Sequence, residues 1–403
     1  MIKEWVDEVH QGDAVDVLSQ MPESSVHTCV TSPPYYGQRD YGEDEQIGLE
    51  DTLDEYIQNL VDVGNELQRV LRDDGTWWLN LGDKFAQSGR SNQDKSGTAP
   101  DGQGHSRGHD AGGFRNKQKM FVPHRVAIAL QESGWLARND NVWHKTNALP
   151  EPHTDRFATR FEFVFLLANS DDYYFDLDSI REPYAKSSIK DFERGYGWSD
   201  GKYVGDSSPH SEGGTNDPDR PRSESQHPAG KNPGDVWSMS TESFSGSHFA
   251  VFPPDLIEKP IKAGCPEQVC VECGTPHVRE RVVESREIKG GVHTVPEDER
   301  GYSEIQGQSQ NDRAGLTQPT SVSLGDWEKQ CNCETDSTEP GIVIDPFMGT
   351  GTTAIVAERF RRRWVGIDLS AEYVDLAGER ISTDRKEKGR PANLLDIGRL
   401  EDD

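Results

Sequence analysis

The chain has 403 residues, a formal net charge of −28 at pH 7 and hydrophobic residues at 33% of its positions. The length suits one large α/β domain with additions, or two domains. No apolar run is long enough to cross a bilayer, and the N-terminus lacks a charged and then apolar signal segment, so we expect a cytoplasmic protein that does not bind membranes. The acidic excess opposes DNA binding in dilute salt, because phosphate binding needs a basic field.

A rigid strand tip is predicted near the N-terminus. Residues 26–30 are apolar and β-prone, which predicts a buried strand, and the two prolines that follow Ser32 must end it. The tip offers the Ser32 hydroxyl, unpaired carbonyl groups and the aromatic ring of Tyr35. These groups suit a flat substrate that bears an amine, such as a nucleobase. An ordinary proline-rich turn is the alternative.

A second motif lies near the other end of the chain. A hydrophobic strand is predicted to end at Asp345, and a turn containing Gly349 and Gly351 leads into a helix-compatible run. The next predicted strand ends at Asp368, about 20 residues past the glycine turn, which is the spacing of a carboxylate that binds ribose hydroxyls. The pattern indicates a site for a nucleotide cofactor.

Together, Ser32-Pro33-Pro34-Tyr35 and the Asp345–Thr352 loop resemble the amino-group DNA methyltransferases that use S-adenosylmethionine. The catalytic motif precedes the cofactor motif, as in the permuted beta arrangement of that family. The resemblance implies a Rossmann-like, mostly parallel, seven-stranded sheet flanked by helices, with a variable target-recognition insertion and a small cysteine-rich insertion. It also implies double-stranded DNA as the substrate. Given the motifs, we interpret the acidic surface as an adaptation to a salty cytoplasm.

The resemblance assigns roles to particular residues. The expected catalytic residues are Ser32, Pro33, Pro34 and Tyr35. The expected cofactor-binding residues are Asp13, His248, Phe252, Asp345, Phe347, Gly349, Gly351, Thr352 and Asp368. Asp13 is equally compatible with a helix N-cap. A Trp-x-Lys-x-Asn-x-x-Pro segment makes Asn147 and Pro150 secondary candidates beside the target-base pocket.

The target base follows from the first tetrapeptide position. In the resembled family a serine there goes mostly with the N4 amine of cytosine, which we therefore favour. Adenine N6 is the alternative, and an RNA or protein amine is a further one. A cognate restriction endonuclease is an expected partner, and the protein is expected to be a monomer or a dimer.

The domain boundaries follow changes in composition. Residues 1–175, 234–264 and 339–403 are assigned to the methyltransferase domain, residues 176–233 to target recognition and residues 265–338 to the cysteine-rich insertion.

The cysteines indicate a metal more than disulfides, because the protein is expected to be intracellular. Cys270 and Cys273 have the spacing of a zinc knuckle, and Cys331 and Cys333 form a tighter second pair. We predict one structural zinc ion bound by these four thiolates. Free thiols are the alternative, as is a site in which His277 or Cys265 replaces one ligand.

Overall fold

The computed structural model describes residues 2–43, 45–86, 113–184, 230–241, 252–287 and 317–389. The chain divides into two compact units. The first comprises Met1–Ser179, Gly234–His277 and Lys329–Asp403, and the second comprises Ile180–Pro233 and Val278–Glu328. His248 and residues 185–229 of the predicted target-recognition region lie outside the described residues. Among the described residues, no helix is both long and apolar enough to span a membrane.

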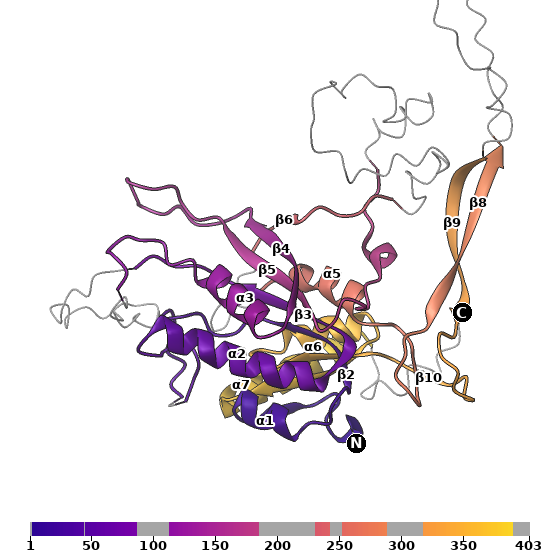
Figure 1. Ribbon diagram of the computed structural model, residues 1–403, viewed down its shortest axis with the longest axis horizontal. Helices are drawn as coiled ribbons and strands as arrows, with labels where there is room; N and C mark the ends of the chain where they lie inside the picture. Colours follow the sequence, from indigo (N-terminus) through magenta and orange to yellow (C-terminus); the bar gives the residue numbers. More distant parts are fainter. Residues whose placement is uncertain are drawn as a thin grey trace, which may run out of the picture. The chain divides into compact units, whose positions relative to one another are not determined.

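An eight-stranded sheet forms the centre of the first unit (Figure 1). Its order is β1-β12-β11-β2-β3-β5-β4-β6, and neighbours run parallel except where β5 pairs with β3 and β4. The strands are β1 (Val9–Gln11), β2 (Val26–Thr31), β3 (Leu71–Leu81), β4 (Leu136–Lys145), β5 (Phe161–Ala168), β6 (Val236–Met239), β11 (Ile342–Asp345) and β12 (Arg363–Asp368).

The Rossmann-like prediction is confirmed, with one strand more than the seven expected. The extra strand is β6, a parallel edge strand that pairs with β4 from Val142↔Val236 to Lys145↔Met239. A pattern of four residues is too short to predict a strand, and pairing with β4 determines the conformation of this segment.

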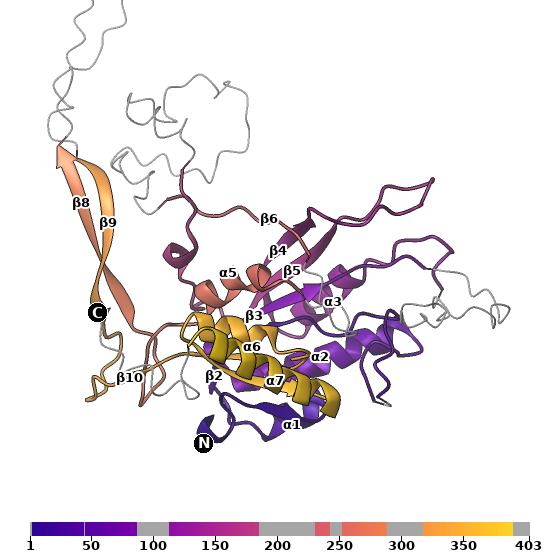
Figure 2. The same ribbon diagram turned by 180° about the vertical axis from the view of Figure 1, so that it is seen from behind.

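Two layers of helices cover the sheet. Helices α1 and α3 each contact α2 on one face, while α5 and α7 each contact α6 on the other. The first layer is in front in Figure 1 and the second is in front in Figure 2, which is seen from behind. The helices are η1 (Ile2–Glu4), α1 (Ala14–Gln20), α2 (Leu53–Val70), α3 (Val122–Glu132), η2 (Leu177–Ile180), α5 (Pro254–Gly264), α6 (Thr352–Arg359) and α7 (Ala371–Glu387).

Helix α2 illustrates how local sequence and packing agree. Thr52 and Glu55 form a capping box at its N-terminus, where the Thr52 side chain accepts from the Glu55 N–H and the Glu55 side chain accepts from the Thr52 N–H. Apolar residues recur at helical spacing on one side, and Leu60 and Leu67 are fully buried in the core. Burial of each such leucine stabilises the fold by roughly 1.5–3 kcal/mol.

The last strands of the chain pack beside the first ones. Strand β11 pairs in parallel with β2, with Val343 opposite Thr28 and Ile344 opposite Cys29. The carboxyl ends of β2 and β11 therefore meet at one edge of the sheet, although more than 300 residues separate Thr28 from Val343. Ligands of open α/β sheets bind at this edge.

Two smaller ladders complete the described structure. Strands β7 (Val269–Cys270) and β10 (Thr338–Glu339) pair antiparallel in the first unit. In the second unit, β8 (Val278–Glu287) and β9 (Thr317–Glu328) form an antiparallel hairpin from Val278↔Glu328 to Glu287↔Thr317.

Candidate active site and cysteine cluster

A cavity of about 570 Å³ opens at the carboxyl ends of the central strands. This volume lies within the range of sites that hold small molecules or cofactors. Its walls come from the turn after β1, the segments that follow β2, β11 and β12, and the ends of β3 and β4. The two motifs predicted from the sequence therefore line one cavity.

Asp345 ends β11, and its side chain holds the glycine loop in place. Its side chain is 1% exposed and accepts hydrogen bonds from Thr31 Oγ1 at 2.5 Å, Thr353 Oγ1 at 2.6 Å and the Phe347 N–H at 3.0 Å. Burial raises the pKa of this carboxyl to about 6. Asp345 does not line the cavity, so any effect on a cofactor passes through the loop.

The two glycines of this loop have different surroundings. Gly349 lines the cavity with φ at 53°, and its N–H donates to Asp368 Oδ2 at 2.7 Å. Gly351, with φ at 81°, faces α7, where an added Cβ would lie 3.1 Å from Ile381 Cδ1. Gly351 is absent from the cavity wall, whereas Phe347 and Thr352 belong to it.

Asp368 lies where β12 ends, and its carboxylate lines the same cavity. Besides the Gly349 N–H, it accepts the Ser370 N–H on Oδ1 at 3.0 Å. Burial raises its pKa. Each carboxylate oxygen can accept a second hydrogen bond, so the group can anchor the loop and still receive a ribose hydroxyl.

Two further predicted cofactor residues also line the cavity. Asp13 is the N-cap of α1, accepting the Val15 N–H at 2.8 Å and the Asp16 N–H at 3.1 Å, and it lies in the cavity wall as well. Its capping role is confirmed, and its contact with a cofactor stays a prediction. Phe252, just before α5, is the second of these two residues and also lies in the cavity wall.

The Ser32-Pro-Pro-Tyr35 tip is held by hydrogen bonds from several elements. The Tyr35 hydroxyl lies 3.0 Å from Glu162 Oε2 and 3.1 Å from Asn80 Oδ1, and Ser32 Oγ lies 3.3 Å from it. The Pro34 carbonyl accepts the Tyr56 hydroxyl at 3.0 Å. Burial, reinforced by the Glu162 charge, raises the pKa of Tyr35 well above its ordinary value, so the phenol stays neutral.

Sequence reasoning missed Asn80 and Glu162, which lie in the cavity wall beside the tip. Each is a polar residue within an apolar run, residues 77–81 of β3 for Asn80 and residues 161–168 of β5 for Glu162, and that irregularity was the available signal. Glu162 also forms an ion pair with Lys145, whose ammonium lies 4.5 Å from the centre of the Trp143 ring.

The two secondary candidates are placed elsewhere. The Asn147 side chain bonds to Thr241, accepting its N–H at 2.8 Å and donating to its carbonyl at 3.1 Å. Asn147 and Pro150 are exposed, and neither lines the cavity. Within the same Trp-x-Lys-x-Asn segment, Trp143 and Lys145 do line it.

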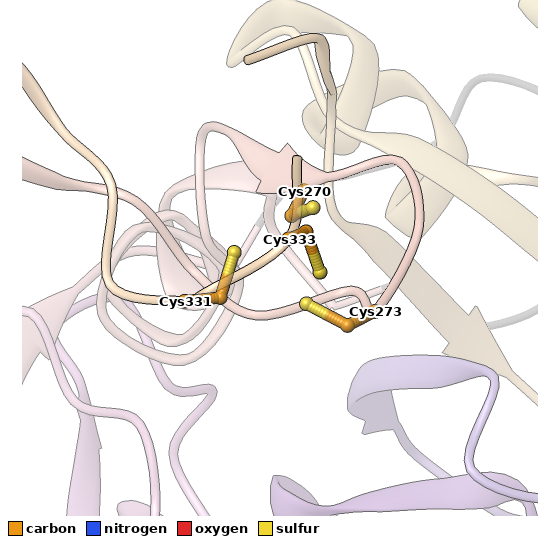
Figure 3. Close-up of side chains that lie close together, drawn as sticks. All are labelled: Cys270, Cys273, Cys331 and Cys333. Atoms are coloured by element: carbon orange, nitrogen blue, oxygen red, sulfur yellow. The ribbon is translucent and has the colours of Figure 1, made fainter. Parts of the chain in front are cut away.

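The four predicted metal ligands converge (Figure 3). The sulfur atoms of Cys270, Cys273, Cys331 and Cys333 all lie within 4.8 Å of one another. None of the four is in a disulfide. Hydrogen bonds with Thr275 lower the pKa of Cys273 to about 6.

One cavity is lined by the glycine loop, by the acidic residue that ends β12 and by the Ser32-Pro-Pro-Tyr35 tip. This combination is typical of an α/β enzyme that uses a nucleotide cofactor. The chain matches the N6/N4 family of DNA methylases over residues 26–271 and 334–379, and it belongs to this family. Membership confirms the amino-group DNA methyltransferase predicted from the motifs and S-adenosylmethionine as its cofactor. The cavity fits this cofactor in three respects: its volume, the Gly349 backbone, which lets a ligand come close, and the Asp368 carboxylate in its wall.

Two curated relatives match almost the whole chain, and a third matches a shorter part at higher identity. Type II methyltransferase M.XycI of Xanthomonas campestris pv. cyanopsidis is 32% identical over 393 residues, which cover 96% of this chain and 89% of the relative. Type II methyltransferase M.Cfr9I of Citrobacter freundii is 31% identical with the same coverage. Type II methyltransferase M.SfiI of Streptomyces fimbriatus is 46% identical over 179 residues, covering 44% of this chain and 40% of the relative.

Proposed function

We propose that this enzyme transfers a methyl group from S-adenosylmethionine to the exocyclic N4 of cytosine at a specific site in double-stranded DNA. The observation that carries the proposal is the meeting of the Ser32-Pro-Pro-Tyr35 tip and the Phe347–Thr352 loop in the wall of one cavity. Ser32 at the first position of the tetrapeptide supports cytosine, following the family resemblance.

The chemistry asks the protein to position the amine. The lone pair of an exocyclic amine is delocalised into the ring and is weakly nucleophilic, and the bound cofactor supplies an electrophilic methyl group. In our proposal, the Ser32 hydroxyl and the Pro33 carbonyl accept hydrogen bonds from the amine of a flipped base. Because Pro34 already holds Tyr56 through its carbonyl, the Pro33 carbonyl is the backbone acceptor we assign. These acceptors stabilise the positive charge that develops on nitrogen.

Tyr35 is proposed as the surface on which the flipped base stacks. Its hydroxyl is held near Asn80 and Glu162, and its ring lies against Gly82, where an added Cβ would come within 2.7 Å of Tyr35 Cε2. A ring fixed at both its tip and its edge is positioned before the base arrives, so stacking costs little further ordering.

The partners follow from the relatives. Three of them are named Type II methyltransferases, and we propose that this enzyme likewise modifies the recognition site of a cognate restriction endonuclease. The net charge of −28 supports a salt-adapted source, in which counterions have already screened repulsion from DNA.

The decisive experiment identifies the methylated base. Unmethylated duplex DNA of mixed sequence is incubated at high salt with the enzyme and labelled S-adenosylmethionine, digested to nucleosides and analysed by mass. Ser32→Ala and Tyr35→Ala are run beside the parent enzyme, and cofactor binding is measured for all three.

We expect N4-methylcytosine from the parent enzyme and none from Tyr35→Ala with its cofactor binding intact. N6-methyladenine would overturn the choice of base. No methylated base despite cofactor binding would overturn the DNA substrate and favour an RNA or protein amine.

A further inference from the structure

We propose that Cys270, Cys273, Cys331 and Cys333 bind one zinc ion, which clamps the two ends of the chain segment between the cysteine pairs. Zinc bound by four thiolates at about 2.3 Å has sulfur atoms about 3.8 Å apart. The four sulfur atoms here lie within 4.8 Å of one another, which is close to that tetrahedron (Figure 3). Bonded sulfur atoms would be only about 2.05 Å apart, and all four thiols are free.

The backbone around the first pair is already folded as a ligand turn. The Gly274 N–H donates to the Cys270 carbonyl at 2.8 Å, and the Cys270 N–H donates to the Thr275 carbonyl at 3.0 Å. Gly274 has φ at 69°, a conformation that glycine adopts without strain. This turn carries the sulfur atoms of Cys270 and Cys273.

The second pair is brought in by the short β7–β10 ladder. Thr338 pairs with Cys270 and Glu339 with Val269, so the strand that follows the second cysteine pair runs beside the first. Lys329 donates to the Cys333 carbonyl and lies 3.2 Å from Asp336 Oδ1, which closes the turn that carries Cys331 and Cys333.

The other sulfur and imidazole candidates lie outside the cluster. Cys265 is fully buried at the end of α5, and its carbonyl accepts the Arg362 side chain at 3.1 Å. His277 is also buried, and its backbone N–H donates to the Gln268 carbonyl at 2.9 Å. Neither belongs to the group of four converging side chains, so within the part of the chain that the structure describes the set consists of thiols, whose thiolates select zinc over harder cations.

The cluster is attached to the end of the sheet opposite the active-site cavity. Arg72 donates to the Cys273 carbonyl at 2.9 Å, and His27 Nε2 lies 3.4 Å from the Gly274 carbonyl. His27 is near the start of β2, and its Nδ1 accepts the N–H of Ile342, the first residue of β11. The cavity lies at the far ends of these two strands, so the metal is structural and takes no part in methyl transfer.

The position of the four cysteines in the chain indicates the structural role of the ion. The hairpin ladder begins at Val278↔Glu328, and Val278 follows His277 directly while Glu328 precedes Lys329. Between the cysteine pairs the chain runs for roughly 60 residues, and closing so long a loop opposes folding. Binding both pairs to one ion offsets that cost, because the binding free energy of a structural zinc adds to the folding free energy. This inference is independent of which base is methylated.

Metal content tests the proposal without relying on activity. The full chain, produced without a histidine tag, is analysed for zinc and iron by mass spectrometry. Zinc release is then followed with a metallochromic dye while a mercurial reagent titrates the thiols. Cys331→Ala is compared with Cys265→Ala, which removes a cysteine outside the cluster. The zinc-free parent protein is also titrated with Co²⁺, which requires no substitution.

We expect one zinc per chain in the parent and in Cys265→Ala, released as four thiols react, and at least tenfold weaker retention in Cys331→Ala. Co²⁺ should give the visible absorption of tetrahedral thiolate coordination. Chelation should speed proteolysis near residues 274–277 and 329–336 while changing S-adenosylmethionine affinity less than about threefold. Equal zinc in both variants, bound iron instead, or four reduced thiols that take up neither Zn²⁺ nor Co²⁺ would overturn the proposal.

Discussion

The hydroxyl of Tyr35 lies 3.0 Å from Oε2 of Glu162, and this contact joins the Ser32-Pro-Pro-Tyr35 tip after β2 to the second residue of β5. The same carboxylate forms an ion pair with Lys145 at the end of β4. One acidic residue of the cavity wall therefore connects β5 with the end of β4 and with the tip that follows β2. Together with the hydrogen bond to Asn80 and the contact between the ring and Gly82, this contact holds the orientation of the tyrosine ring.

Tyr35→Phe keeps the ring and removes the tether. We expect a loss of up to about tenfold in kcat, since one hydrogen bond contributes roughly 0.5–1.5 kcal/mol. Tyr35→Ala removes the stacking surface and should cost at least about a hundredfold. Single-turnover kinetics on duplex DNA measure both. Equal activity of the two variants would show that the ring does not hold the base.

Glu162→Gln removes the charge that pairs with Lys145 and keeps the size of the side chain. We expect kcat to fall by about tenfold, because the amide changes the position of both Lys145 and Tyr35. Glu66→Gln is the matched control, since Glu66 forms a 2.9 Å ion pair with Arg69 on the surface of α2. Similar losses in the two variants would argue against a positioning role for Glu162.

Asp368→Ala should weaken S-adenosylmethionine binding ten- to a hundredfold, or about 1.4–2.8 kcal/mol. The substitution removes the acceptor of the Gly349 N–H together with the proposed ribose contact. Calorimetric titration of the cofactor gives the dissociation constant. Asp375→Ala on the exposed side of α7 is the control and should bind the cofactor normally. Unchanged affinity in Asp368→Ala would remove Asp368 from the cofactor site.

Asp345 predicts a pH dependence of stability. Its pKa is about 6 in the folded protein against an ordinary value of 3.8, so the folded state binds more protons between these pH values. Stability contributed by the protonated carboxyl is therefore present at low pH and lost as the pH rises through 6. Asp345→Asn should lack this loss, which amounts to about 3 kcal/mol.

Thermal unfolding of the parent and of Asp345→Asn from pH 4 to pH 7 isolates this contribution, because all other carboxyl groups are common to both proteins. We expect the difference in Tm to change steadily in favour of the variant as the pH rises. A difference that does not vary with pH would contradict the assignment.

The acidic charge predicts a salt response opposite to that of an ordinary DNA-binding protein. We expect methyl transfer to be maintained or to rise as KCl approaches molar concentrations, because salt screens repulsion between the protein and DNA. Initial rates over a KCl series measure this, with sucrose series as a control for general stabilisation. A steep fall in rate with increasing salt would contradict a salt-adapted source.

The sequence by itself determined the fold class, the two motifs and the four cysteines of the cluster. These features are local or repetitive: prolines end a strand wherever it lies, and an apolar strand followed by a glycine turn gives the same loop in many proteins. The spacing of Cys270 and Cys273 is likewise local, because two cysteines separated by two residues can bring their sulfur atoms together within one turn. The helical spacing of apolar residues also predicted α2 from the sequence.

Only the tertiary structure decided which residues share the cavity. Asn80 and Glu162 contact Tyr35, and Lys145 pairs with Glu162, because β3, β5 and β4 follow one another in the sheet. That order depends on strand pairing between distant segments. The same packing placed Asp345 and Gly351 outside the cavity wall, although their motif is contiguous with the residues that line it. A loop has an inner and an outer side, and its packing against Thr31 and α7 determines which side each residue occupies.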